Sequence, residues 1–123
     1  MKNLLARRDF LAWTAAAAAA PLAHAQAAWP TRPVTMVVPF PAGGGTDAFA
    51  RPMSAQFSRL TGQQLIIDNK GGGGGTVGAA AAAKLAPDGY GLFMGAVHHA
   101  IAPSVYPKLS YDIEADFVPM ILV

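Results

Sequence analysis

The residues best placed to do chemistry are the glycines that follow an apolar run near the start of the chain. Val34–Pro39 is predicted to be a buried strand, Phe40–Gly45 an irregular loop, and a helical pattern begins at Asp47. Such a loop presents unpaired backbone N–H groups at the positive end of a helix dipole. Glycine has no Cβ to keep a ligand away from them. The stretch is therefore either an anion-binding loop or a tight connection without a ligand.

The elements that must position this loop alternate between apolar runs and helical patterns. Gln64–Asn69, Leu92–Val97 and Phe117–Val123 are predicted to be further strands. Strand-helix units spaced by about 30 residues predict an α/β fold with a parallel sheet and right-handed crossovers. The first helix is expected over Asp47–Leu60, with an apolar face formed by Phe49, Met53, Phe57 and Leu60.

Local signals predict how the helices begin and end. Thr46 or Asp47 is expected to cap the first helix and Gly62 to end it. Pro52 predicts either a late start or a bend, because proline lacks a backbone donor. An alanine-rich helix capped by Thr76 is expected to lie close to the sheet, and Pro103 and Pro107 are expected to bracket a short turn or helix.

Three loops are expected to meet beyond the carboxyl ends of the strands, where ligands of parallel sheets bind. They are Phe40–Asp47, Lys70–Thr76 with its five consecutive glycines, and Val97–Ala100.

Other chemistries are less well supported. Gly73-x-Gly75-x-x-Gly78 fits a dinucleotide fingerprint, but no carboxylate ends the next strand, and no Gly-Lys precedes Ser or Thr as a phosphate-binding loop requires. His98 and His99 lack partner ligands for a metal, because cysteine is absent and no second histidine cluster exists. No serine lies in a Gly-x-Ser-x-Gly elbow. We expect no catalytic residue, metal or cofactor.

Residues 1–25 have the form of a cleaved export signal. Lys2, Arg7 and Arg8 precede the apolar run Phe10–Leu22, and Ala23-His24-Ala25 has the form of a cleavage site. Arg7-Arg8-Asp9-Phe10-Leu11 is similar to a twin-arginine motif, with the general secretory route as the alternative. The absence of cysteine excludes disulfides and a lipid-anchored cysteine. We expect a soluble, exported chain.

The remaining residues, 26–123, are nearly neutral. Removing 1–25 takes three of nine Lys/Arg and one of seven Asp/Glu, which leaves six against six. This balance argues against a nucleic-acid or acidic-membrane binder.

Taken together, the motifs resemble those of the Bug family, the periplasmic receptors of tripartite tricarboxylate transporters. The matching stretches are Trp29-Pro30-x-Arg32-Pro33, Val38–Gly44 with Asp47, Ala50-Arg51, Asp68-Asn69-Lys70, Pro87-Asp88-Gly89-Tyr90, His99-Ala100-Ile101-x-Pro103, Tyr111-Asp112 and Asp116-Phe117-x-Pro119.

The resemblance implies a type II periplasmic-binding-protein fold, in which two lobes close on a small carboxylate such as a dicarboxylate, tricarboxylate, aromatic acid or acidic amino acid. The receptor would be a periplasmic, non-enzymatic monomer that delivers its ligand to membrane permease subunits. Family members are much longer, so residues 26–123 would be the incomplete first part of lobe one. An α/β enzyme using the same loop, or a remnant without a ligand, is the alternative.

The resemblance also implies residue roles. Phe40, Pro41, Ala42, Gly43 and Gly44 would cradle the carboxylate, and Asp47 would fix the loop or meet a ligand donor. Gly74, Gly75 and Thr76 would form the facing wall, and His98 and His99 would lie at the end of the third strand. This sequence departs from the family pattern at Ala102, at Val97-His98 and at Pro52.

Overall fold

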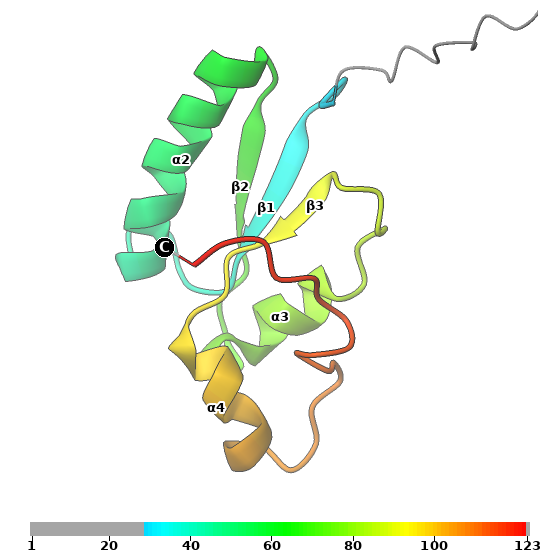
Figure 1. Cartoon of the computed structure of the whole chain (residues 1–123). Coiled ribbons are helices and arrows are strands. Elements are labelled where there is room, and N and C mark those ends of the chain that lie inside the picture. The colour runs from blue at the N-terminus through cyan, green and yellow to red at the C-terminus, as the bar shows by residue number, and fades with distance from the viewer. Residues whose placement is uncertain (1–28, 123) are drawn as a thin grey trace, which may run out of the picture.

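The computed structural model describes residues 29–122, which form a three-stranded parallel sheet flanked by helices (Figure 1). The predicted export signal, 1–25, lies outside these residues. The elements in chain order are β1 (Val34–Val38), α2 (Gly45–Thr61), β2 (Leu65–Asn69), a 3₁₀ turn η1 (Gly73–Gly75), α3 (Thr76–Ala82), β3 (Gly91–Phe93) and α4 (Val97–Val105).

β1 is the central strand of the sheet, whose order is β2-β1-β3. Both neighbours run parallel to it, with Val34 opposite Leu65 and Thr35 opposite Gly91. The predicted α/β fold with a parallel sheet is confirmed. Because all three strands run the same way, their carboxyl ends lie at one edge, where the loops into the helices begin.

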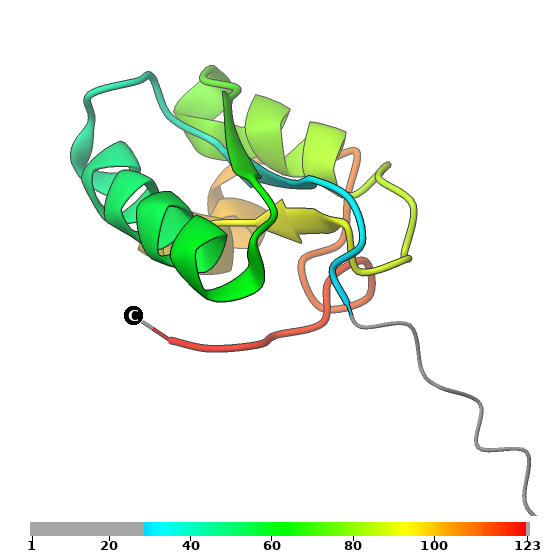
Figure 2. The ribbon, with the colours of Figure 1, turned by 90° about the horizontal axis from the view of Figure 1, so that it is seen from above.

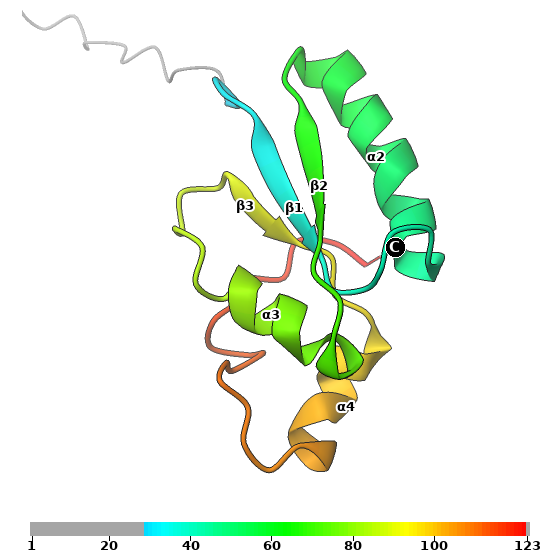
Figure 3. The same cartoon turned by 180° about the vertical axis from the view of Figure 1, so that it is seen from behind.

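The sheet is covered on both faces, which explains the continuous apolar run of β1. Val34, Met36 and Val38 form one core cluster with Ala50 of α2, and Met53 and Phe57 of the same helix pack against that cluster. Figure 2 shows α3 on the opposite side of the sheet from α2, and Figure 3 shows α3 from that side.

α2 differs from the expected helix at its start and on its buried face. It begins at Gly45 with Gly44 as N-cap and no side-chain cap, so capping by Thr46 or Asp47 was wrong. It also runs through Pro52 without a late start. Phe49 is 65% exposed and Leu60 is 75% exposed, whereas Asp47 and Ala50 are buried. The end at Gly62, with φ of 72°, is confirmed.

α3 approaches the sheet closely, as its small residues predicted. A Cβ on Gly78 would lie 2.6 Å from the Lys70 carbonyl oxygen and 2.6 Å from Pro39 Cα. The N-cap is Gly75 rather than Thr76, whose hydroxyl donates to the Gly73 carbonyl at 2.9 Å.

The third strand is shorter than expected and a helix follows it. β3 ends at Phe93, the Met94 N–H extends the pairing to the Val37 carbonyl, and α4 then begins at Val97. The strand predicted over Leu92–Val97 is therefore wrong after Met94. The helix also contains Pro103 instead of lying between Pro103 and Pro107.

Residues 117–122 form no strand, although their apolar sequence predicted one. Phe117 packs on Phe93, with ring centroids 4.9 Å apart, and the segment that follows is exposed, with Leu122 at 96%. None of the helices within residues 29–122 is both long and apolar enough to cross a bilayer.

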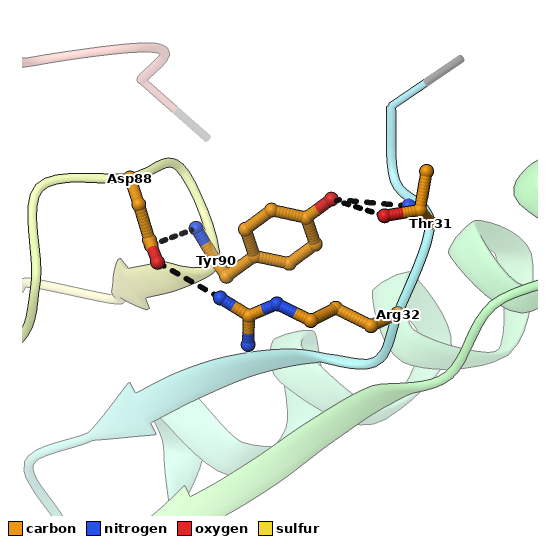
Figure 4. A network of polar contacts seen from close by, with 4 residues as sticks. All are labelled: Thr31, Arg32, Asp88 and Tyr90. Atoms are coloured by element: carbon orange, nitrogen blue, oxygen red, sulfur yellow. Dashed lines mark hydrogen bonds and ion pairs between the residues drawn. The ribbon is translucent and has the colours of Figure 1, made fainter. Parts of the chain in front are cut away.

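A polar network fastens the entry segment to the turn before β3 (Figure 4). Arg32 Nη2 lies 2.8 Å from Asp88 Oδ2, and its guanidinium carbon lies 3.9 Å from the centre of the Tyr90 ring. The Tyr90 hydroxyl oxygen accepts the Thr31 N–H at 3.1 Å. This network lies at the amino-terminal end of β1 and β3.

Candidate functional site

The three predicted loops meet at the carboxyl edge of the sheet, at the bottom of Figure 1. Phe40 in the first loop and His98 in the third have ring centroids 5.3 Å apart. His99 Nε2 lies 3.3 Å from the Gly75 carbonyl oxygen in the second loop. A Cβ on Gly71 would lie 3.2 Å from the Pro41 side chain, so the first and second loops also touch. The expectation that these loops converge is confirmed.

The first loop presents free backbone donors. The N–H groups of Gly45, Thr46 and Asp47 have no hydrogen-bond acceptor among residues 29–122. They are the first N–H groups of a 17-residue helix, where the helix dipole places partial positive charge. This arrangement can hold a carboxylate or another small anion without a charged side chain.

Asp47 fixes the shape of this loop. Its carboxylate is buried, and Oδ2 accepts the Gly43 N–H at 2.8 Å and Arg51 Nε at 2.6 Å. The Gly43 hydrogen bond, followed by the Arg51 hydrogen bond, holds the pKa of Asp47 below its usual value, although burial acts in the opposite direction. Asp47 is thus ionised, and both of its carboxylate oxygens accept hydrogen bonds from neighbouring groups of the fold.

Asn69 is a site residue that the sequence reasoning missed. Its side-chain amide donates to the Phe40 carbonyl at 3.1 Å and to Asp47 Oδ1 at 3.0 Å. The available signal was an asparagine at the carboxyl end of the strand beside β1. Through these two bonds β2 supports both the first loop and the buried carboxylate of Asp47.

The second loop reaches the first through its glycines. Gly74 and Gly75 have φ of 64° and 94°, values that favour glycine. A Cβ on Gly75 would lie 2.9 Å from His99 Nε2 and 3.3 Å from the tip of the Phe40 ring. A side chain at this position would therefore push the three loops apart.

The two histidines have different environments. His99 is 3% exposed, and its Nδ1 accepts the Ala96 N–H at 3.0 Å. Its Nε2 lies 3.3 Å from the Gly75 carbonyl oxygen. His98 is exposed beside Phe40. Both lie in the first turn of α4, which corrects their expected place at a strand end.

The charged side chains around the three loops have partners within the fold. The nearby cations Arg51 and Lys70 are paired with Asp47 and Asp68. Within residues 29–122, no group of three or more His, Cys, Asp or Glu residues could bind a metal ion. The Ser54 hydroxyl in α2 donates to the Leu65 carbonyl rather than facing a base.

Comparison with known proteins places these features in context. Residues 49–123 match the family model described as tripartite tricarboxylate transporter family receptor. A protein encoded in the tcbD-tcbE intergenic region of Pseudomonas sp. strain P51 is 39% identical over 120 residues, covering 96% of this chain and 36% of its own length. The protein BugT of Bordetella pertussis is 37% identical over 97 residues, covering 77% of this chain and 30% of its own length.

Solved structures give the same picture. MatC from Rhodopseudomonas palustris, with bound malate, superposes with a TM-score of 0.69 at 43% identity over 74% of this chain and 31% of that chain. The periplasmic binding protein BugD superposes with a TM-score of 0.65 at 42% identity over 68% of this chain and 28% of that chain. An R. palustris protein with adipate gives 0.65 and 42%, with the same coverage. This chain thus spans about a third of the length of its curated relatives.

Proposed function

We propose that this chain supplies one wall of a carboxylate-binding site in a periplasmic solute receptor. The premise is that the chain belongs to the tripartite tricarboxylate transporter receptor family. The family is one of binding proteins rather than enzymes. The observation that carries the proposal is the set of unpaired N–H groups at Gly45, Thr46 and Asp47. Relatives of similar fold hold malate and adipate, both small dicarboxylates.

The proposed roles follow the geometry of the first loop. Phe40–Gly44 and the start of α2 cradle the carboxylate through backbone donors. Asp47 acts on the loop and not on the ligand, because its oxygens already have three partners. The preference for one carboxylate over another then rests on the shape of the three loops and on the other wall of the site, which closes over them.

The other two loops have different proposed roles. Gly74, Gly75 and Thr76 form the facing wall, and the exposed His98 ring beside Phe40 contacts the ligand at the rim. His99 holds the second and third loops together, because both of its ring nitrogens have backbone partners.

The proposed biological context is uptake. An exported receptor of this family captures its carboxylate outside the cytoplasm and delivers it to permease subunits in the membrane. The N–H cradle suits this task, because it binds the anion without changing it and can release it unchanged.

Gly45 offers a direct test of the cradle. It is the first residue of α2, where proline is tolerated, and Gly44 before it is extended, as proline requires. Gly45→Pro removes one free N–H, and Gly45→Ala is the matched control, since a Cβ there meets nothing within 4 Å. Losing one hydrogen bond to a charged ligand costs about 1.5–3 kcal/mol, or roughly ten- to a hundredfold in affinity.

The experiment measures affinity for malate, succinate and adipate by calorimetry and thermal melting, using the full chain and its variants. We expect concentration-dependent stabilisation by at least one of them, with weaker binding by Gly45→Pro and unchanged binding by Gly45→Ala. Equal affinities in the two variants would contradict the cradle. Consumption of the ligand would favour the enzyme alternative, and flat melts across the panel would favour the remnant.

A further inference from the structure

The apolar core on the α2 side of the sheet is open at one end. Met53 and Phe57 of α2 pack against the buried cluster, and Phe49 lies on the same face of the helix, one turn before Met53. Phe49 is nevertheless 65% exposed. The stripe of α2 that contacts the core thus continues toward the carboxyl edge of the sheet, and no other element within residues 29–122 covers it there.

A strip of apolar residues, 118–122, is exposed on the same side of the sheet. Its large side chains are 74–96% exposed, those of Val118, Met120, Ile121 and Leu122. Phe117, whose ring packs on that of Phe93, places the start of the strip beside β3. Figure 2 shows the strip on the α2 side of the sheet, and in Figures 1 and 3 it ends level with the first turns of α2. Contiguous exposed apolar surface is typical of an interaction site.

The sheet itself is open at β3, which is one of its outer strands. The Tyr90 carbonyl and the Met94 N–H bond to β1, and alternate residues of a strand bond to the same neighbour. Gly91 and Phe93 therefore direct their N–H and C=O groups away from β1, and these groups have no hydrogen-bond partner among residues 29–122. Such an edge can pair with a further strand.

The length of the relatives indicates which partner fits these features. This chain spans about a third of its curated relatives, so about two-thirds of a receptor of this family lies outside the matched part. That remaining polypeptide can supply elements to cover α2 and to pair with β3. A second copy of this chain is a poorer fit, because it brings the same open surfaces and, within residues 29–122, only the short strip 118–122 to fill them.

We propose that the open face, defined as Phe49, the strip 118–122 and the outer edge of β3, is a docking surface for the polypeptide that forms the rest of the receptor fold, and that the two parts assemble as separate molecules. Burial of apolar side chains drives this association without a peptide bond between the parts. Residues 26–123 carry six Lys/Arg and six Asp/Glu, so net charge does not oppose it. The proposal rests on the family assignment and not on the carboxylate cradle.

The test uses the full chain and the part of BugD that follows the matched region, produced as a separate polypeptide. The two are refolded together without any carboxylate, and the mass of the product is measured by analytical ultracentrifugation. We expect a one-to-one complex, as for the matching first part of BugD refolded with the same polypeptide. If this chain does not assemble, the proposal is wrong. Gly45→Pro should assemble as the parent does, which separates this surface from the first-loop cradle.

Three variants locate the interface. Phe49→Lys and Ile121→Lys should each weaken assembly at least tenfold, because each places a charge in the buried contact. Leu60→Lys is the matched control, since Leu60 is also exposed and apolar but lies in the last turn of α2; it should leave assembly unchanged. Equal weakening by all three variants, or by none, would overturn the proposal. So would a dimer of this chain that forms through the open face and excludes the BugD polypeptide.

Discussion

A single buried carboxylate couples the first loop to α2 and β2. Asp47 receives hydrogen bonds from the Gly43 N–H, from Arg51 one turn along α2, and from Asn69 on β2. Because Asn69 also binds the Phe40 carbonyl, the loop is fixed at both of its ends by side chains from two elements. The free N–H groups of Gly45 and Thr46 are thereby held in place by the fold itself.

The lowered pKa of Asp47 makes acid stability a test of this arrangement. A carboxyl whose pKa is lower in the folded chain than in the unfolded chain stabilises the fold fully above its unfolded pKa, about 3.9, and loses this contribution as the pH falls through the folded value. Asp47→Asn should therefore destabilise the chain most near pH 7, and the difference from the parent should shrink below about pH 4.

Chemical denaturation of the parent and of Asp47→Asn, at pH values from 7 to 3, measures this difference. Other carboxyls with lowered pKa, such as Asp112, contribute to both proteins and cancel. A difference that stays constant with pH would mean that the charge of Asp47 does not carry the effect.

At the scale of elements, the sequence predicted what short-range patterns determine. The β-branched run of β1 and the apolar run of β2 gave strands close to the observed bounds, and Gly62 marked the end of α2. The start of α4 escaped prediction because its N-cap is a contact between the Ala96 N–H and the His99 ring. Residues 117–122 have the composition of a strand but no ladder partner among residues 29–122.

For the site too, the sequence predicted the features that follow from local patterns and missed those that depend on contacts between distant residues. Which loops converge followed from parallel strands alone, whereas the hydrogen bonds of Asn69 depend on the register that places it beside Val38. The predicted apolar face of α2 is correct at Met53 and Phe57, which pack against the core, and wrong at Phe49 and Leu60. Asp47 satisfies its polar atoms within the loop and can be buried, which turns Phe49 outward.

Gly78 tests the contact between α3 and the sheet. In an exposed helix position, glycine to alanine stabilises by about 1 kcal/mol. At Gly78 the new Cβ would lie 2.6 Å from backbone atoms of both Lys70 and Pro39, which cannot move without shifting two loops. Overpacking of this kind costs about 1–3 kcal/mol, and more where backbone must move.

We therefore expect Gly78→Ala to lower the melting temperature and Gly45→Ala, where the space is open, to leave it unchanged or raise it. Thermal denaturation followed by circular dichroism measures both. If Gly78→Ala were as stable as Gly45→Ala, α3 would not be pressed against the sheet as described.

At the scale of the whole molecule, the two ends of the sheet carry different structural features. The carboxyl edge carries the three loops, whereas the opposite end is held by Arg32, Asp88 and Tyr90 (Figure 4). Trp29 adds an edge contact to Phe57 of α2, with ring centroids 6.0 Å apart. The entry segment therefore joins β3 and α2, two elements that are distant in the sequence.

This separation predicts that stability and ligand affinity can be changed independently. Arg32→Ala removes an exposed ion pair, worth at most about 1 kcal/mol, and a cation–π contact worth about 0.5–1 kcal/mol. We expect a loss of about 1–2 kcal/mol in the free energy of unfolding and no change in carboxylate affinity. Lys70→Ala, which removes another exposed pair, is the comparison and should cost less. A change in affinity in Arg32→Ala would show that the two ends are coupled.

The glycine loop also constrains how this gene can vary. Gly72, Gly73, Gly74 and Gly75 all have positive φ, at 129°, 55°, 64° and 94°, and every change to the first or second base of a glycine codon introduces a side chain or a stop. Such backbone strongly disfavours any other residue. Neutral drift in this segment is therefore confined almost entirely to the third base of each codon, so the segment should stand out in a population of genes as a block of synonymous variation.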